Sequence, residues 1–178
     1  MIVRLECVGS EPSTWQEVVE LSPAALRHPE VVDLSPVEVS GSVTPAGRDF
    51  LLEARLCFRV TVACDRCTGP VHEQVESVLR LVAVPNVAPT PGEGEVALRS
   101  EELGVVELPG EELDTAPLVA EQVQLELPAR PLCRPDCAGL CPRCGANLNE
   151  GPCGCAPDDD DPRWAALAGL MTKLGRGE

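Results

Sequence analysis

FLLEARLCFRVTVACDRC, residues 50–67, decides the fold, because it alternates apolar and polar side chains and then ends in two cysteines. An extended chain places successive side chains on opposite faces. One face would be apolar, with Leu56, Phe58, Val60 and Val62, and the other polar, with Arg55, Cys57, Arg59 and Thr61. The pattern predicts a long β-strand with one face in the core and one in water.

The segments before and after this strand predict its two neighbours. Residues 37–43 also alternate, and the turn-forming sequence PAGR at 45–48 connects them to the strand. After Cys64 and Cys67, the sequence TGP at 68–70 reverses the chain into a third strand at 71–84. We therefore expect an antiparallel meander with the cysteine pair at one end. Weaker signals predict a strand near 1–7 and a short helix from Ser13 or Thr14 to Glu20.

The second half of the chain is less regular. The sequence predicts a loop at 85–95, a strand at 103–108, and a helix at about 113–126 that is capped by Asp114 or Thr115. The expected fold class is α+β, with an antiparallel β meander or partly open, barrel-like sheet and a few helices. We expect three regions: the mainly β domain 1–127, a Cys-rich, zinc-binding segment 128–157, and an acidic linker with an amphipathic helix at 158–178.

Composition limits the classes of function. The chain has 178 residues, with 14 Lys+Arg against 29 Asp+Glu and a net charge of −15. Such a charge repels phosphate unless the few arginines gather locally, so basic partners are favoured over nucleic acid. Aromatic residues make up 2%, too few for a base-stacking platform. No uncharged apolar run approaches the ~18 residues of a membrane helix, and no secretion signal is evident. We expect a cytoplasmic protein without a membrane or small-molecule partner.

Eight of the ten cysteines fall in close sets, the number that two four-cysteine zinc sites need. In CPRCG, residues 141–145, two thiols can face one point while the glycine lets the backbone curl around a metal. We group Cys141, Cys144, Cys153 and Cys155 around one zinc, although Cys133 or Cys137 could replace a member. The second site would consist of Cys64, Cys67, Cys133 and Cys137, which requires the meander's end and the C-terminal segment to meet in space.

Other chemistries compete for these cysteines. Disulfides, a redox-active dithiol and an iron–sulfur cluster remain open, and His72 has the spacing of a zinc-knuckle ligand relative to Cys64 and Cys67. Zinc held by four thiolates has no open position for water, and a structural zinc contributes roughly 10 to 16 kcal/mol in small peptides. The sequence contains no phosphate-binding glycine loop, nucleophile elbow or paired histidine and carboxylate at helical spacing. We therefore expect structural zinc and no enzyme.

The order of these motifs resembles the YceD family, the bacterial large ribosomal RNA subunit accumulation proteins. The resemblance covers about residues 37–174 and includes CDRC at 64–67 and LD at 113–114. It continues with EQ at 121–122, LELP at 125–128, PLC at 131–133, GLCP at 139–142, CG at 144–145, LN at 148–149, CGC at 153–155 and DPR at 161–163.

The resemblance implies a non-enzymatic, cytoplasmic ribosome biogenesis factor that supports 23S rRNA accumulation or processing and large-subunit assembly. An acidic chain suits a basic large-subunit ribosomal protein as its partner. Contact with a 23S rRNA precursor would need a local group of cations, for which the candidates are Arg55, Arg59, Arg66, Arg130, Arg134 and Arg143. A zinc- or thiol-based redox sensor is the alternative function, and an RNA-cleaving enzyme is a third.

Overall fold

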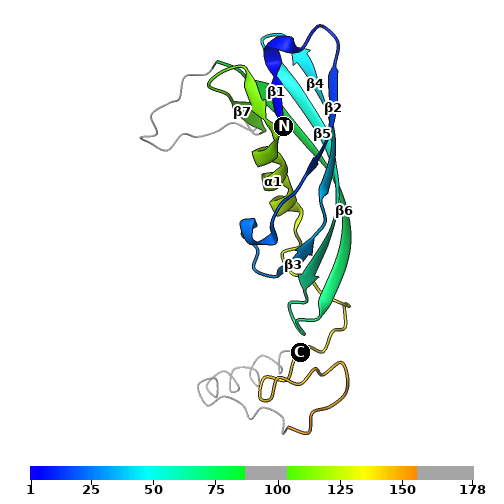
Figure 1. Ribbon diagram of the computed structural model, residues 1–178. Helices are drawn as coiled ribbons and strands as arrows, with labels where there is room; N and C mark the ends of the chain where they lie inside the picture. Colours follow the sequence, from blue (N-terminus) through cyan, green and yellow to red (C-terminus); the bar gives the residue numbers. More distant parts are fainter. Residues whose placement is uncertain (87–103, 156–178) are drawn as a thin grey trace, which may run out of the picture. The chain divides into compact units, whose positions relative to one another are not determined.

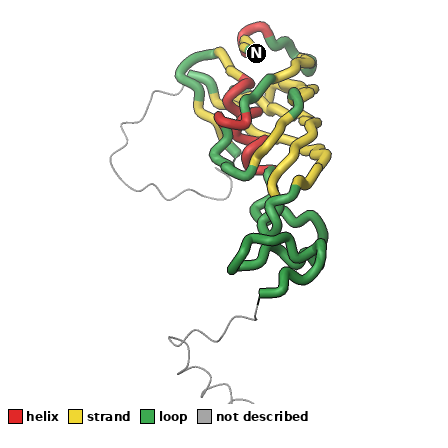
Figure 2. The backbone as a smooth tube through the Cα atoms, turned by 60° about the horizontal axis from the view of Figure 1, so that its bottom comes forward, coloured by secondary structure: helices red, strands yellow, loops and turns green. Residues whose placement is uncertain are grey.

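The computed structural model describes residues 1–86 and 104–155 (Figure 1). The chain divides into two compact units, Met1–Pro135 and Asp136–Glu178. The first contains all the helices and strands of the described residues. The described part of the second consists of loops and turns (Figure 2).

Strand β5 (Asp49–Ala63) is the centre of the first unit. It pairs antiparallel with β4 (Val37–Ala46) on one side and with β6 (Pro70–Val84) on the other, which confirms the predicted meander. The turn between β4 and β5 contains Gly47, whose φ of 74° lies in the left-handed region. A two-residue connection favours such backbone angles, and glycine adopts them at little cost.

The other strands extend the meander into an open sheet of six strands. The strand order is β2-β4-β5-β6-β7, and β3 pairs with the part of β5 that β4 leaves free. Of the strands in the described ranges, β7 alone runs parallel to its neighbour. A separate two-stranded pair combines β1 with β8. The bounds are β1 Ile2–Arg4, β2 Ser13–Val19, β3 Val31–Leu34, β7 Val105–Glu107 and β8 Glu112–Asp114, and two short 3-10 helices are η1 (Leu5–Cys7) and η2 (Pro23–Ala25).

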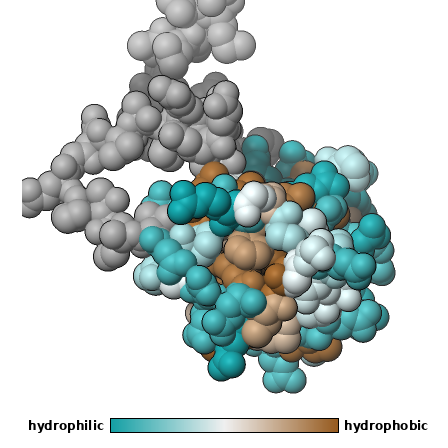
Figure 3. All heavy atoms as spheres, turned by 90° about the horizontal axis from the view of Figure 1, so that it is seen from above, coloured by the Kyte–Doolittle hydropathy of each residue, from teal (hydrophilic) through white to brown (hydrophobic). Residues whose placement is uncertain are grey.

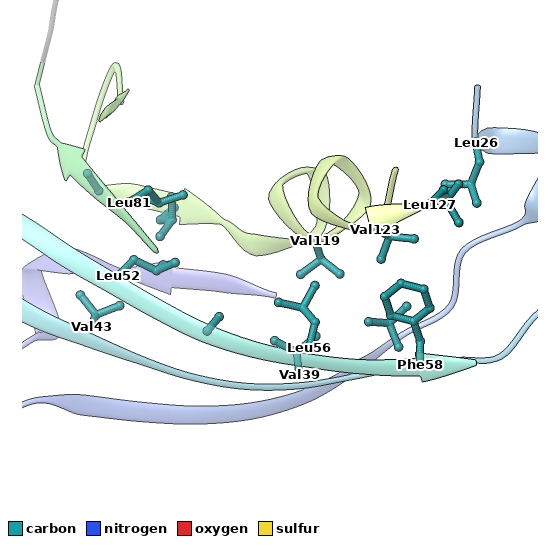
Figure 4. Packing of buried hydrophobic residues seen from close by; sticks show 14 of the residues in the cluster. Leu26, Val39, Val43, Leu52, Leu56, Phe58, Leu81, Val119, Val123 and Leu127 are labelled. Carbon is teal, nitrogen blue, oxygen red and sulfur yellow. The ribbon is translucent and has the colours of Figure 1, made fainter. Parts of the chain in front are cut away.

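Helix α1 (Thr115–Glu126) covers one face of this sheet. Its first turn is capped as the sequence predicts, because the Asp114 carboxylate accepts a hydrogen bond of 3.1 Å from the Ala116 N–H. Val119 and Val123, four residues apart, are buried on the side of the helix that faces the sheet, toward Leu56 and Phe58 (Figure 4). The apolar face of β5 is therefore the floor of the core, as its alternation indicates.

The opposite face of the six-stranded sheet carries no helix or strand among the described residues (Figure 1), and we call it the outer face. Arg55 and Arg59 lie on it because their positions alternate with the buried ones. The outer face also carries cross-strand ion pairs, such as Arg80 Nη2 and Glu53 Oε1, which are 2.9 Å apart. At the end of the unit seen in Figure 3, by contrast, apolar residues gather inside a hydrophilic rim.

Two expectations about the fold are wrong. Residues 13–20 do not form a helix, because Ser13–Val19 pair residue by residue with β4 as strand β2. The fold is mostly β rather than α+β, since the described residues contain one α-helix. The expected meander is present, and the sheet that contains it is open at β2 and β7. The expected strand at 103–108 is present as β7. The expected helix within 158–178 and most of the loop at 85–95 lie outside the described residues.

Candidate metal centres

A tight turn after β5 positions the first two cysteines. The Cys64 N–H donates to the Gly69 carbonyl (2.8 Å), and the Thr68 N–H donates to the Cys64 carbonyl (2.9 Å). Thr68 has a φ of 57°, in the left-handed region that a β-branched residue rarely adopts. The turn buries the side chains of both Cys64 and Cys67.

A distant segment of the same unit brings a third thiol to this turn. The Asp65 N–H donates to the Pro131 carbonyl (2.8 Å), which ties the segment before Cys133 to the turn. The Cys133 N–H then donates to Cys64 Sγ (3.4 Å), and the Sγ atoms of Cys67 and Cys133 are 3.7 Å apart. All three sulfur atoms lie within 4.8 Å of one another.

The spacing and charge of these three thiols fit a tetrahedral metal. At a zinc–sulfur distance of about 2.3 Å, neighbouring sulfurs of a tetrahedron are about 3.8 Å apart, close to the distance between Cys67 and Cys133. Burial alone would raise the pKa of Cys64, but the backbone N–H groups of Cys133, Arg66 and Cys67 donate hydrogen bonds that lower it to about 6. Cys64 is therefore prepared as the thiolate that a metal requires.

The second unit repeats the same turn around Cys141. The Cys141 N–H donates to the Ala146 carbonyl and the Gly145 N–H donates to the Cys141 carbonyl, both at 2.8 Å. These are the same relative positions as in the turn at Cys64. Gly145, at the place of Thr68, has a φ of 74°.

Four thiols meet around this second turn: the sulfur atoms of Cys141, Cys144, Cys153 and Cys155 all lie within 4.8 Å of one another. Hydrogen bonds from the backbone N–H groups of Cys144 and Arg143 lower the pKa of Cys141 to about 6. The pKa of Cys155 is raised to about 12 by hydrogen bonds with Cys144, Cys153 and Cys141, which favour the protonated form of its thiol. A cation at this position would replace that proton.

Cys137 is the remaining cysteine of the Cys-rich segment and belongs to the second unit. It is 2% exposed. The Asn149 side chain donates from Nδ2 to Cys137 Sγ (3.3 Å) and accepts from the Ala138 N–H (2.8 Å). An amide donor stabilises a thiolate. This role of Asn149 was not predicted from the sequence. The available signal was an asparagine close to the cysteines along the chain.

The competing uses of the cysteines differ in their fit to this geometry. None of the ten cysteines, all of which lie in the described ranges, forms a disulfide. His72 lies on the outer face, where its Nδ1 is 3.0 Å from Thr61 Oγ1, and it is not among the groups of metal-ligating side chains in the described residues. Four thiolates would saturate a zinc ion, so such a site supplies structure rather than an activated water.

The six candidate arginines lie on different elements of the two units. Arg55 and Arg59 lie on the outer face, and neither forms an ion pair with a described residue. Arg66 lies within the Cys64 turn, and Arg130 is 3.5 Å from Asp65 beside it. Arg134 follows Cys133 in the first unit, whereas Arg143 lies in the second cysteine turn.

No helix within the described ranges is both long enough and apolar enough to span a membrane.

Comparisons with known proteins identify relatives of the chain. Residues 52–171 match the family model described as large ribosomal RNA subunit accumulation protein YceD. An uncharacterized protein of Mycobacterium tuberculosis is 38% identical over 109 residues, which cover 61% of this chain and 49% of that protein. An uncharacterized protein of Mycobacterium leprae is 30% identical over 138 residues, or 77% of this chain and 60% of the relative.

A plant protein extends the comparison. The chloroplastic large ribosomal RNA subunit accumulation protein YCED homolog 1 of Arabidopsis thaliana is 25% identical over 166 residues, which cover 82% of this chain and 52% of the plant protein. The chain thus spans about half the length of most of the curated relatives it matches. No solved structure matches it. The family match covers both cysteine turns, most of the meander and α1, and it shows that the chain belongs to the YceD family of large ribosomal RNA subunit accumulation proteins.

Proposed function

We propose that this protein is a non-enzymatic, cytoplasmic ribosome biogenesis factor that supports 23S rRNA accumulation or processing and large-subunit assembly. The observation that carries the proposal is the family match over residues 52–171. The printed name of the plant relative agrees with it. The cysteine sets favour a binding role over catalysis, because a metal held by four thiolates has no position left for a substrate or water.

Two structural zinc ions are part of this proposal. One is held by Cys141, Cys144, Cys153 and Cys155, whose sulfurs already lie together. The other is held by Cys64, Cys67 and Cys133, with Cys137 as the fourth ligand. Two points support Cys137: it is the one thiol of the Cys-rich segment outside the other sets, and it follows Cys133 by four residues. Its hydrogen bond from Asn149 suits a thiolate.

Zinc analysis tests these assignments. The protein purified without chelator should contain two zinc ions and no iron, and Cys137→Ser should reduce zinc to one ion. Cys57→Ser is the matched control, because Cys57 lies on β5 outside both sets, and it should retain two ions. An iron–sulfur absorption spectrum, or two zinc ions in the Cys137→Ser protein, would refute the assignment.

The partner we propose is a basic large-subunit ribosomal protein, a 23S rRNA precursor, or both. The net charge of −15 favours the basic protein, because opposite charges steer association over a Debye length of about 8 Å at cellular salt. Direct RNA contact would use the arginines that the fold leaves accessible. Arg55 and Arg59 on the outer face are the best placed of these, since no ion pair with a described residue occupies them.

A tagged pull-down from growing cells, washed at low and high salt, tests the function. We expect enrichment of a basic large-subunit protein that survives nuclease treatment, or of 23S precursor RNA, together with reduced mature 23S rRNA after depletion. Normal 23S rRNA in depleted cells would contradict the proposal. Normal rRNA combined with reversible zinc release by mild peroxide would instead support the redox-sensor alternative, for which Cys144 and Cys155 are exposed.

A further inference from the structure

Strand β2 is the edge strand at one end of the six-stranded sheet. It pairs with β4 on one side, and among the described residues no strand pairs with its other side (Figure 1). All 7 residues of β2 belong to this edge, whereas β3 has 4 residues and β7 has 3. Among the described residues, β6 also has an unpaired stretch, 70–81, which begins at a proline and ends where β7 pairs with it. An edge strand presents a row of backbone N–H and C=O groups to which another chain can bind.

The devices that usually block such an edge are largely missing from β2. Its sequence, STWQEVV, contains neither proline nor lysine. Its register with β4 continues from Ser13↔Val43 to Val19↔Val37 without a bulge. One inward charge remains, Glu17, but its carboxylate accepts hydrogen bonds from the Met1 ammonium (2.9 Å) and the Trp15 indole (3.2 Å), so it is compensated within the fold. The edge is therefore free of bulges and open to pairing.

The charge beside this edge selects its partner. Apart from the compensated Glu17, residues 5–26 contain Glu6, Glu11 and Glu20 and no lysine or arginine, and β4 adds Glu38 without a cation. Going from β2 across the outer face, the first cation is Arg55 on β5, which is in register with Ser40 on β4. A strand placed beside β2 would therefore meet acidic groups, which attract a basic segment and repel an acidic one.

A hollow in the outer face offers space for side chains of such a strand. It has a volume of about 550 Å³ and lies over β2, β4 and β5, with Val18, Glu38 and Arg55 among its lining residues. Alternate residues of an added strand would point to this face. Val18, which is 63% exposed, would contact their apolar stems, and Glu38, its partner in register on β4, would attract their charged ends.

We propose that β2 binds an extended, basic segment of a partner protein as an additional strand of the sheet. Backbone hydrogen bonds to the free edge supply the affinity, and the acidic surroundings supply the preference for arginine and lysine. This inference rests on the proposed function, because it locates the surface that a basic ribosomal protein would use.

The test uses the full chain and a labelled peptide of about nine alternating arginine and threonine residues, long enough to span β2. Fluorescence anisotropy should show binding, and hydrogen exchange should show added protection of amides in 13–19. Val18→Lys should weaken binding by about tenfold, because it places a like charge at the edge. Val32→Lys is the matched control: Val32 is 65% exposed on β3, and the change in charge is the same. It should alter binding less than twofold by the same reasoning.

A second peptide separates strand pairing from attraction between charges. The same sequence with every other amide N-methylated keeps its charge but cannot form the strand hydrogen bonds, and it should not bind. Equal binding of the two peptides, or equal losses in Val18→Lys and Val32→Lys, would overturn the inference.

Pull-downs with the Val18→Lys protein distinguish this inference from the proposed function. If the wild-type protein enriches a basic large-subunit protein and Val18→Lys enriches it equally, the edge inference fails while the function stands. Loss in Val18→Lys but not in Val32→Lys supports both. If the wild-type protein enriches neither ribosomal protein nor rRNA, the function fails and the peptide results alone decide the inference.

Discussion

Thr68 occupies the position in the first cysteine turn that Gly145 occupies in the second. In both turns this residue donates its N–H to the carbonyl of the first cysteine, and in both its φ is positive, 57° for Thr68 and 74° for Gly145. Glycine adopts this conformation freely, whereas a β-branched residue is strained in it. The Thr68 hydroxyl donates to the Cys67 carbonyl at 2.7 Å, which helps to hold the residue there.

The strain at Thr68 can be measured by comparing two substitutions. Thr68→Ala removes the hydroxyl hydrogen bond and keeps the strain, whereas Thr68→Gly removes both. We expect the Gly variant to be more stable than the Ala variant by about 1 kcal/mol in urea unfolding of the zinc-loaded protein. If the Ala variant is as stable as the Gly variant, or more stable, the backbone at position 68 is not strained.

Gly41 is needed for the packing of Trp15. These residues are cross-strand partners, and a Cβ on Gly41 would overlap the indole ring. Gly41→Ala should therefore displace Trp15 and lower the free energy of unfolding by about 1 to 3 kcal/mol. In a Trp164→Phe background, where Trp15 is the one remaining tryptophan, its fluorescence should shift to longer wavelength.

Gly9→Ala is the control for this substitution, since a Cβ at Gly9 would meet nothing within 4 Å. It should change stability by less than about 0.5 kcal/mol. Unchanged Trp15 emission in the Gly41→Ala protein would mean that the ring does not lie on Gly41.

Elements that depend on a local sequence pattern can be predicted from the sequence. Elements that depend on contacts with distant segments of the chain cannot. The alternation from Arg55 to Val62 suffices for β5, and Asp114 with Pro117 suffices for the start of α1. The sequence predicts a helix at 13–20 because Ser13 and Thr14 are good caps, whereas the strand β2 found there forms by pairing with β4.

The candidate site follows the same division. The spacing of Cys141 and Cys144 identifies their turn, because both thiols lie within one local structure. The approach of Cys133 to Cys64 depends on a backbone contact between Asp65 and Pro131, which no spacing in the sequence encodes. The strained φ of Thr68 is equally hidden, since threonine gives no signal for a left-handed conformation.

Removing the second thiol set should affect only the second unit. Cys141→Ser combined with Cys144→Ser should reduce bound zinc from two ions to one and make 136–155 sensitive to protease, because this segment contains no helix or strand of its own. The meander, with its own core, should keep its circular dichroism and its resistance to proteolysis. Cys7→Ser, at an exposed cysteine outside both sets, is the control and should retain two ions. An unchanged digestion pattern in the double variant would refute a metal-dependent second unit.

Acid should release the metal from both sites in the same pH range. Cys64 and Cys141 each have a pKa lowered to about 6, whereas a cysteine in an unfolded chain has a pKa of about 8.5. Between these values the folded sites hold thiolates that an unfolded chain would protonate, so this contribution to stability is fully present above about pH 8.5 and is lost as the pH falls through about 6. A bound cation lowers thiol pKa values further. Titration from pH 8 to 4 with a colorimetric zinc indicator should give a midpoint at or below about pH 6. A midpoint above about pH 7 would show that the backbone N–H donors around Cys64 and Cys141 do not stabilise their thiolates.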